Sequence, residues 1–353
     1  MTGSVIPNQP AGGGVLARLR HLARWETLLL LLIAVLVWIG ASLSPVFLTT
    51  RNLPNLIVAV IEVAIMALPM ALVIIVGEID LSVESMAGLA CALLGFLFKA
   101  GVPVELAIPV VLVVGALGGL LNGLLVTRVG LPSLVVTLGT LALYRGLALG
   151  ILGPQGVAGF PEWFTTFGFR TVPGTPLPWP ALIFVALAIV LGLVLHTTWI
   201  GRYIYAIGKN ASAARFSGVP VARTRLLLFI LSGTVAALAG VILTARFASA
   251  RADIGQGLTL TVVTIVLLGG VNIFGGRGTI PGVILAATTL AVLGNVLRLT
   301  SVSAEIQSIA VGLLLVISVV LPNFAHQLRG AIGRASGGPR MAAGRAGAGE
   351  ASP

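Results

Sequence analysis

Long apolar runs separated by short polar or Gly/Pro-containing breaks dominate the chain, and runs such as 28–39 and 110–126 do not alternate polar with apolar positions. A helix of about 20 apolar residues crosses the hydrocarbon core of a bilayer, whereas membrane β-strands alternate over about ten residues. The pattern therefore predicts an all-α, polytopic membrane protein. About ten spans are expected, near residues 27–46, 53–76, 84–98, 104–126, 133–152, 180–197, 226–246, 258–272, 280–298 and 305–321.

Two of these spans, 84–98 and 258–272, are short and lie beside charged or Gly-rich breaks. This pattern is typical of re-entrant or broken helices that line a cavity within the protein. The ends, 1–25 and 323–353, are rich in Gly, Ala and Pro and have little apolar surface to bury, so we expect disordered cytoplasmic tails on either side of a transmembrane domain, 26–322.

Composition agrees with this reading, since the mean hydropathy is +1.11 and only 9% of residues are charged. The net charge of +11 does not indicate nucleic-acid binding, because basic clusters beside membrane spans follow from the positive-inside rule. With both termini inside, 14 of the 21 Lys and Arg residues fall in cytoplasmic segments and six fall outside, while Arg145 lies within a span. The single cysteine, Cys91, excludes an internal disulfide and a cysteine metal cluster.

The segment Gly77–Ser85 places three carboxylates, Glu78, Asp80 and Glu84, between two apolar spans. Each costs about 2.5–3.5 kcal/mol at the centre of a membrane helix. They therefore require a membrane surface, a water-filled cavity or a neighbouring cation. The favoured interpretation is a solvated turn in which Asp80 or Ser82 caps the next helix, and the alternative is a role in a gate or pathway.

Glu62 lies inside an otherwise apolar span, and an intramembrane acid is a functional candidate. Arg145 in the fifth span is one possible partner. A structural salt bridge and a cavity-lining role both remain open.

The sequence lacks the motifs expected of an enzyme. The glycines of Leu268–Thr279 do not form a phosphate-binding loop, since the chain has no G-x-x-x-x-G-K-[ST], and they favour tight turns and close helix packing. His21, His196 and His326 are separated and lack the spacing of a hydrolase. We expect no cofactor in this chain, which must transport passively, use an ion gradient or depend on ATP hydrolysis in another subunit.

The order and spacing of several strings resemble the membrane-spanning permeases of bacterial ABC importers for ribose, xylose, rhamnose and related sugars. The resemblance covers about residues 26–322. It rests on Gly77–Ser85, Leu121–Gly123, Val136–Thr140, Gly201–Arg202, Ala206–Asn210, Ala213–Gly218, Leu267–Gly270 and Gly275–Ile280. Glu78 and Glu84 replace the glycines that are commoner in such proteins, and Ala248–Gly255 is more similar to permeases for rhamnose or autoinducer 2.

The resemblance implies a multi-pass protein of the bacterial inner membrane. Two permease subunits, identical or not, form the pathway, a cytoplasmic ATPase binds ATP and Mg below, and a periplasmic sugar-binding protein delivers solute. It also implies a coupling loop at 198–225 that contacts the ATPase, with the residues Gly208, Asn210, Ala213, Ala214, Arg215, Phe216, Ser217 and Gly218. An ion-coupled secondary transporter and a branched-chain amino acid permease are the alternatives.

Overall fold

The computed structural model describes residues 25–318 and 320, whose regular secondary structure is almost entirely helical, so the predicted all-α class is confirmed. The helices are α2 (Trp25–Leu43), α3 (Leu53–Val58), α4 (Ile61–Ile75), α5 (Val83–Lys99), α6 (Val104–Leu124), the π-helical turn η1 (Leu125–Val129), α7 (Ser133–Leu152), α8 (Glu162–Phe169), α9 (Trp179–Thr197), α10 (Trp199–Lys209), α11 (Ala211–Phe216), α12 (Val221–Phe247), α13 (Leu258–Leu268), α14 (Ile280–Leu299) and the helix Ala304–Ser318. Two short strands, β1 (Val157–Ala158) and β2 (Ser249–Ala250), pair antiparallel.

In the described part of the chain, six helices are long and apolar enough to cross a membrane: α2, α6 with η1, α7, α9, α12 and α14. The remaining predicted spans contain shorter helices. Helix α13 has 11 residues, about 16 Å at 1.5 Å per residue, or roughly half of a hydrocarbon core. The eighth predicted span is therefore short, as expected, and it ends at Leu268 rather than at residue 272.

The second predicted span, 53–76, is not one helix. It divides into α3 and α4 at Ala59 and Val60, where the backbone of Val60 leaves the helical region at φ −128°. Four of the five residues in 57–61 are β-branched, and such side chains lose rotamer freedom in a helix. Their apolar character continues the hydropathy of the span, so the sequence pattern did not indicate this break.

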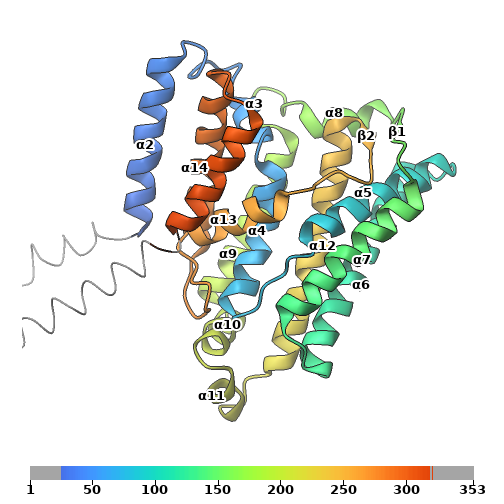
Figure 1. Cartoon of the computed structure of the whole chain (residues 1–353), viewed down its shortest axis with the longest axis vertical. Coiled ribbons are helices and arrows are strands. Elements are labelled where there is room, and N and C mark those ends of the chain that lie inside the picture. The colour runs from blue at the N-terminus through green and yellow to red at the C-terminus, as the bar shows by residue number, and fades with distance from the viewer. Residues whose placement is uncertain (1–24, 319, 321–353) are drawn as a thin grey trace, which may run out of the picture.

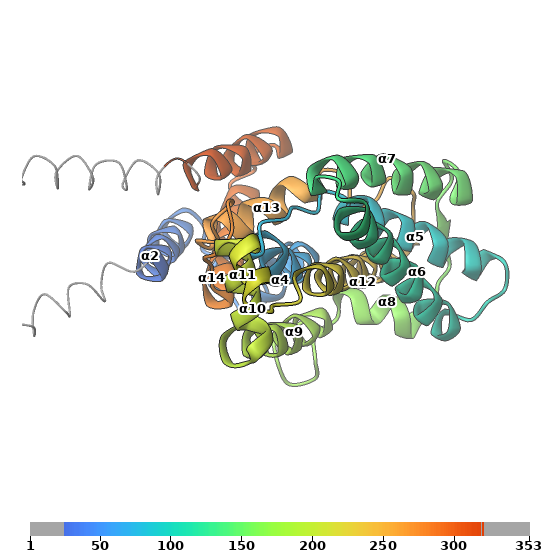
Figure 2. The ribbon, with the colours of Figure 1, turned by 90° about the horizontal axis from the view of Figure 1, so that it is seen from below.

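Helix α12 is the central element and packs on α4, α5, α6 and α8 (Figures 1 and 2). Small residues permit these approaches, because a Cβ on Gly119 of α6 would lie 2.2 Å from the carbonyl oxygen of Phe229 in α12. A Cβ on Gly240 of α12 would lie 2.3 Å from the carbonyl oxygen of Ala87 in α5. In lipid the hydrophobic effect does not drive helices together, so close backbone contact of this kind, with its van der Waals packing, stabilises their association.

The bundle has two distinct ends. Figure 1 shows α10 and α11 at one end and α3, α8, β1 and β2 at the other. The predicted loop 198–225 is mostly helical, with α10, α11 and the first turn of α12, which begins at Val221 rather than at residue 226. The tails predicted to be disordered, apart from residue 25 at the start of α2, lie outside the described residues.

Candidate functional site

Helices α10 and α11 form a helical elbow between α9 and α12. Asn210 separates the two helices in an extended conformation, and its side-chain oxygen accepts a hydrogen bond of 2.9 Å from the amide of Ala213, which caps α11. Gly218 follows α11 with φ +81°, a left-handed conformation that favours glycine. Local capping and one glycine therefore shape the predicted coupling segment as a compact helical projection.

The tip of the elbow is mostly exposed. Phe216 is 93% exposed, whereas Ala214 is buried against the protein. Asn210, Ala213, Arg215, Ser217 and Gly218 are also exposed. Phe274, in the loop between α13 and α14, is also 80% exposed. Seven of the eight predicted coupling residues thus lie on α11 or next to it.

The eighth, Gly208 of α10, lies at a crossing of three segments. A Cβ at this position would be 1.8 Å from the carbonyl oxygen of Ile75 and 2.4 Å from the amide nitrogen of Gly276. These two atoms form a hydrogen bond with each other, from Gly276 N to Ile75 O at 2.8 Å. The elbow is therefore packed without a gap against the end of α4 and the loop between α13 and α14.

That loop contains the Gly-rich segment, and its glycines have the expected role. Gly270, Gly275, Gly276 and Gly278 all have positive φ. A Cβ on Gly282 of α14 would lie 2.1 Å from the carbonyl oxygen of Gly269. Tight turns and close packing are confirmed here.

The carboxylate segment is not a solvated turn, so that expectation was wrong. Asp80 is 1% exposed, and Glu78 and Ser82 are also buried. Ser82 precedes α5 but makes no side-chain capping bond. Instead, Asp80 Oδ1 accepts from the amide and the hydroxyl of Ser82 at 3.0 and 2.6 Å, and its Oδ2 accepts from the hydroxyl of Ser232 at 2.7 Å.

The contacts of Asp80 extend into a buried polar network that joins three helices. Asn122 of α6 donates to the hydroxyl of Ser82 at 2.9 Å, while Ser232 comes from α12. Sequence reasoning missed Ser232, because serine in a membrane helix usually bonds to its own backbone and nothing marks the exceptions. Asn122 belongs to Leu121–Gly123, one of the strings that resemble other permeases, but its partner was not predicted.

The two glutamates that flank Asp80 each face an arginine. Glu78 lies 3.0 Å from Nε of Arg225, although the contact is out of line for a hydrogen bond. Glu84 lies 4.0 Å from Arg145, and its Oε2 accepts from the amide of Thr259 at 2.9 Å. Of the three environments predicted for these carboxylates, a neighbouring cation is the one found for both glutamates, while hydroxyl and amide groups satisfy Asp80.

Glu62 pairs with Arg246 and not with Arg145. Its Oε2 accepts from Arg246 at 2.7 Å, and Arg246 also donates to the carbonyl oxygen of Val58 at 2.7 Å. Arg246 lies on α12, 21 residues after Arg225, or about 32 Å along a helix. Two ion pairs thus lie about one hydrocarbon thickness apart at opposite ends of α12.

The arrangement of helices and buried polar groups is that of a membrane permease. It has membrane-length helices, short and broken helices inside the bundle, an interior polar network, and an exposed helical elbow at one end. No three His, Cys, Asp or Glu side chains within residues 25–318 are grouped to hold a metal ion.

Comparison with known proteins gives the particular family. Residues 52–320 match the permease component of the branched-chain amino acid transport system, so the chain belongs to that family and is the permease component of an ABC importer. Similar proteins include the autoinducer 2 import system permease protein LsrD of Yersinia enterocolitica, 42% identical over 73% of this chain and 79% of the relative. The LsrD proteins of Yersinia pseudotuberculosis and Yersinia pestis are 40% identical over the same shares. No solved structure matches the chain.

Proposed function

We propose that this chain carries autoinducer 2, or a sugar-like solute of similar size, across the bacterial inner membrane as one permease subunit of an ATP-driven importer. The relatives that share at least 40% of its sequence over 73% of its length are named for autoinducer 2 import, which favours this solute over rhamnose, ribose or xylose. The family description leaves a branched-chain amino acid as the alternative solute.

The observation that carries the proposal is the helical elbow. Four cations, Arg202, Lys209, Arg215 and Arg223, are exposed on α10, α11 and the start of α12. Basic residues beside membrane spans favour the cytoplasmic side. An exposed Phe216 among these cations suits an apolar pocket with an acidic rim on a cytoplasmic ATPase subunit.

The packing supports a route for coupling. Because Gly208 contacts the Ile75–Gly276 hydrogen bond directly, a displacement of α11 moves the end of α4 and the loop 269–279 with it. Close-packed segments transmit such displacements because they have no space to absorb them. In this account the ATPase binds ATP and Mg, and this chain holds neither.

The Asp80 network has a different role in this account. It joins α5, α6 and α12 through Ser82, Asn122 and Ser232, and Glu78 and Glu84 add ion pairs on either side. Buried charges held by hydrogen bonds resist relative movement, because separating the partners exposes an unpaired charge. We assign these residues to a rigid core that holds α5, α6 and α12 together.

Co-purification tests the subunit assignment. Mild-detergent extraction of the tagged chain from its native membrane should retain an ATPase subunit and a second permease subunit, identical to this chain or not. Uptake of autoinducer 2 by the same cells should depend on that ATPase and on a periplasmic binding protein. A chain that is recovered alone and moves solute when only an ion gradient is present would instead be a secondary transporter, and competition by leucine would indicate an amino acid permease.

A further inference from the structure

A second exposed phenylalanine lies beside the elbow. Phe274, in the loop between α13 and α14, is 80% exposed. Arg277 in the same loop is also exposed and forms no ion pair within the part of the chain that the structure describes. The elbow has the same combination, because Arg215 and Phe216 are both exposed at the end of α11. Aromatic residues and arginine are enriched at protein interfaces, so the loop has the composition of a contact surface.

Hydrogen bonds hold Phe274 in a closed turn. Its amide donates to the side-chain oxygen of Asn272 at 2.8 Å, and the amide of Gly275 donates to the carbonyl oxygen of Asn272 at 2.9 Å. The amide of Asn272 donates in turn to the carbonyl oxygen of Arg277 at 3.0 Å, which closes the loop. The side chain of Phe274 is therefore exposed on an ordered backbone. A surface that is ordered in advance loses less conformational entropy when a partner binds.

The loop packs on the elbow. A Cβ on Gly276 would lie 3.0 Å from Cγ of Lys209, the last residue of α10. The hydroxyl of Tyr205, also in α10, donates to the carbonyl oxygen of Gly278 at 2.7 Å. Close packing and a hydrogen bond thus fix the loop on α10, and segments packed in this way move together. A partner that binds the elbow therefore meets the loop as part of the same surface.

The position of the loop favours a soluble partner over lipid. Figure 1 shows the loop between α13 and α14 extending past the start of α2, toward α10 and α11. Helix α2 is one of the membrane-length helices, so a segment beyond its end lies outside the hydrocarbon core.

Charge indicates the chemistry of that partner. The loop adds one exposed cation to the four on the elbow, and neither 199–225 nor 269–280 contains Asp or Glu. Complementary potentials on the two sides of an interface favour the correct partner. The partner must therefore supply acidic groups around the pocket that receives an aromatic side chain.

The elbow alone offers a small contact. Helix α11 has 6 residues, whereas a stable protein interface involves about 20–30 residues on each side. A partner that binds this end of the permease therefore needs more surface than α11 provides. The loop supplies such surface, with its own aromatic side chain and its own cation.

We infer that the loop 272–277 is a second docking contact for the ATPase subunit that binds the elbow. Phe274 inserts into an apolar pocket of the ATPase, and Arg277 lies against the acidic rim of that pocket. Because the loop joins α13 directly to α14, an ATPase that holds both contacts displaces these two helices together with α10. The inference rests on the proposed import function, since it assigns a second contact to the same partner.

Photocrosslinking tests the contact in the assembled transporter. The photoreactive analogue p-benzoyl-phenylalanine replaces Phe274, Phe216 or Phe169 in three separate full-length variants. Phe169 is the matched control, because it is 51% exposed and ends α8 at the opposite end of the bundle (Figure 1). We expect irradiation to join the ATPase to the chain from positions 274 and 216, and not from position 169.

Mass spectrometry of the adducts separates the outcomes. An adduct from position 216 but not from 274 would overturn this inference and leave the proposed function intact. An adduct from position 274 with lipid, or with another segment of this chain, would also overturn it. Absence of an ATPase from the purified native transporter would instead contradict the proposed function itself.

Alanine substitution measures how much the contact contributes. Phe274→Ala should raise the Kd of the ATPase for the permease about tenfold. Combined with Phe216→Ala, it should raise the Kd about a hundredfold, since separate contacts contribute additively. The Tm of the permease should stay the same, because the side chain of Phe274 is exposed. A Kd that Phe274→Ala leaves unchanged would overturn the inference.

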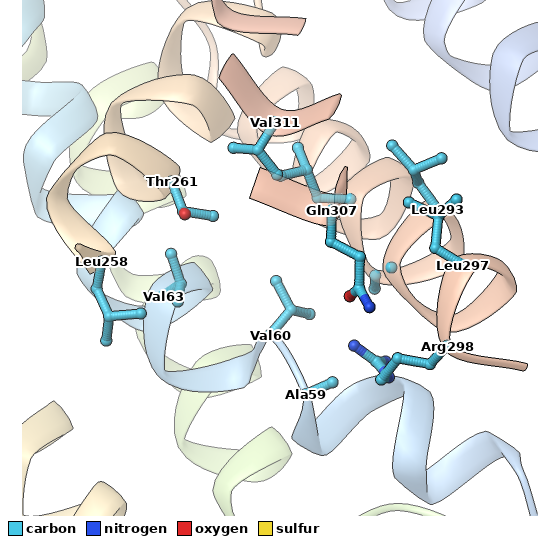
Figure 3. Close-up of a pocket in the computed structure, with 13 residues that line it drawn as sticks. Ala59, Val60, Val63, Leu258, Thr261, Leu293, Leu297, Arg298, Gln307 and Val311 are labelled. Atoms are coloured by element: carbon cyan, nitrogen blue, oxygen red, sulfur yellow. The ribbon is translucent and has the colours of Figure 1, made fainter. Parts of the chain in front are cut away.

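Arg277 has a matched control at the other end of the bundle. Arg298 is also exposed and has no ion pair among the described residues. Figure 3 shows it near Gln307 on the wall of a cavity of about 190 Å³. Arg277→Gln should raise the Kd of the ATPase about threefold at low salt and less at high salt, because exposed charges are screened. Arg298→Gln should leave the Kd unchanged, and equal Kd values for the two variants would contradict the acidic rim.

Discussion

Replacing Gly208 with alanine tests the contact on which the coupling route depends. The added Cβ would lie 1.8 Å from the carbonyl oxygen of Ile75 and 2.4 Å from the amide nitrogen of Gly276. Ordinary van der Waals contact begins near 3.4 Å. Helix α10 must therefore move by about 1.5 Å, or the Gly276–Ile75 hydrogen bond must break, because both atoms belong to backbone and cannot rotate away.

The magnitude follows from these two costs. Overpacking of a close contact costs about 1–3 kcal/mol, and loss of one buried backbone hydrogen bond costs about 1 kcal/mol more. A change of about 2–4 kcal/mol in a chain of this size lowers Tm by about 3–5 °C. Since the strain falls on the crossing itself, the amount of solute moved per ATP should fall together with Tm.

The measurement compares Gly208→Ala with Gly150→Ala, in detergent for Tm and in liposomes with the partner subunits for coupling. Gly150 lies inside α7 with nothing within 4 Å of an added Cβ. Alanine there should stabilise the helix by about 0.5–1 kcal/mol. If Gly208→Ala matched Gly150→Ala in both Tm and coupling, the crossing would not carry the function assigned to it.

Three further substitutions test other parts of the account. Ser232→Ala removes the donor to Asp80 Oδ2 and should destabilise the protein by about 1–3 kcal/mol in thermal unfolding. The control, Ser42→Ala on the exposed face of α2, should not destabilise it. Equal Tm values for the two variants would show that Asp80 is not part of the rigid core. Arg225→Met should lower Tm by leaving Glu78 without its cation, and adding Glu78→Gln should restore much of the loss, so additive losses would contradict the ion pair. Phe216→Ala should lower the amount of ATPase that co-purifies with this chain about tenfold. Leu48 is also exposed, and Leu48→Ala should leave that amount unchanged. Unchanged co-purification in both variants would exclude Phe216 as a docking residue.

Substitutions at Ala214 and Gly218 would be poorer tests of docking than the substitution at Phe216. Glutamate at Ala214 would introduce a charge at a buried position, so it would disturb the packing of α11 as well as docking. Gly218 is exposed but has φ +81°, so a bulky side chain there would strain the backbone. Phe216 is the cleaner probe, because its side chain is 93% exposed.

Hydropathy predicted the fold class and the location of most helices. The reason is that every span of a bilayer must be apolar and must satisfy its backbone hydrogen bonds internally. The break at Ala59–Val60 was not predictable in this way. Its β-branched residues are as apolar as the helices on either side, so the hydropathy of the span continues across it. The short α13 was predictable, since a Gly-rich segment follows it directly.

Partners were harder to predict than elements. Glu62 and Arg246 are 184 residues apart in sequence, and Arg145 was an equally reasonable partner until the helices were placed in space. The acidic segment misled local reasoning for the same reason. Its residues fit a capped, solvated turn, but Ser232 and Asn122 from distant helices bury it. Tertiary contacts between separate helices therefore override a local capping preference here.

Reconstitution tests whether ATP hydrolysis in a partner subunit drives transport by this chain. The purified chain is placed in liposomes with its ATPase and second permease subunits, with ATP and Mg on the ATPase side and the binding protein loaded with autoinducer 2 on the other. We expect solute movement toward the ATPase side that requires ATP hydrolysis and persists when ionophores abolish every ion gradient. Movement by this chain without the ATPase, driven by an ion gradient and stopped by an ionophore, would contradict it.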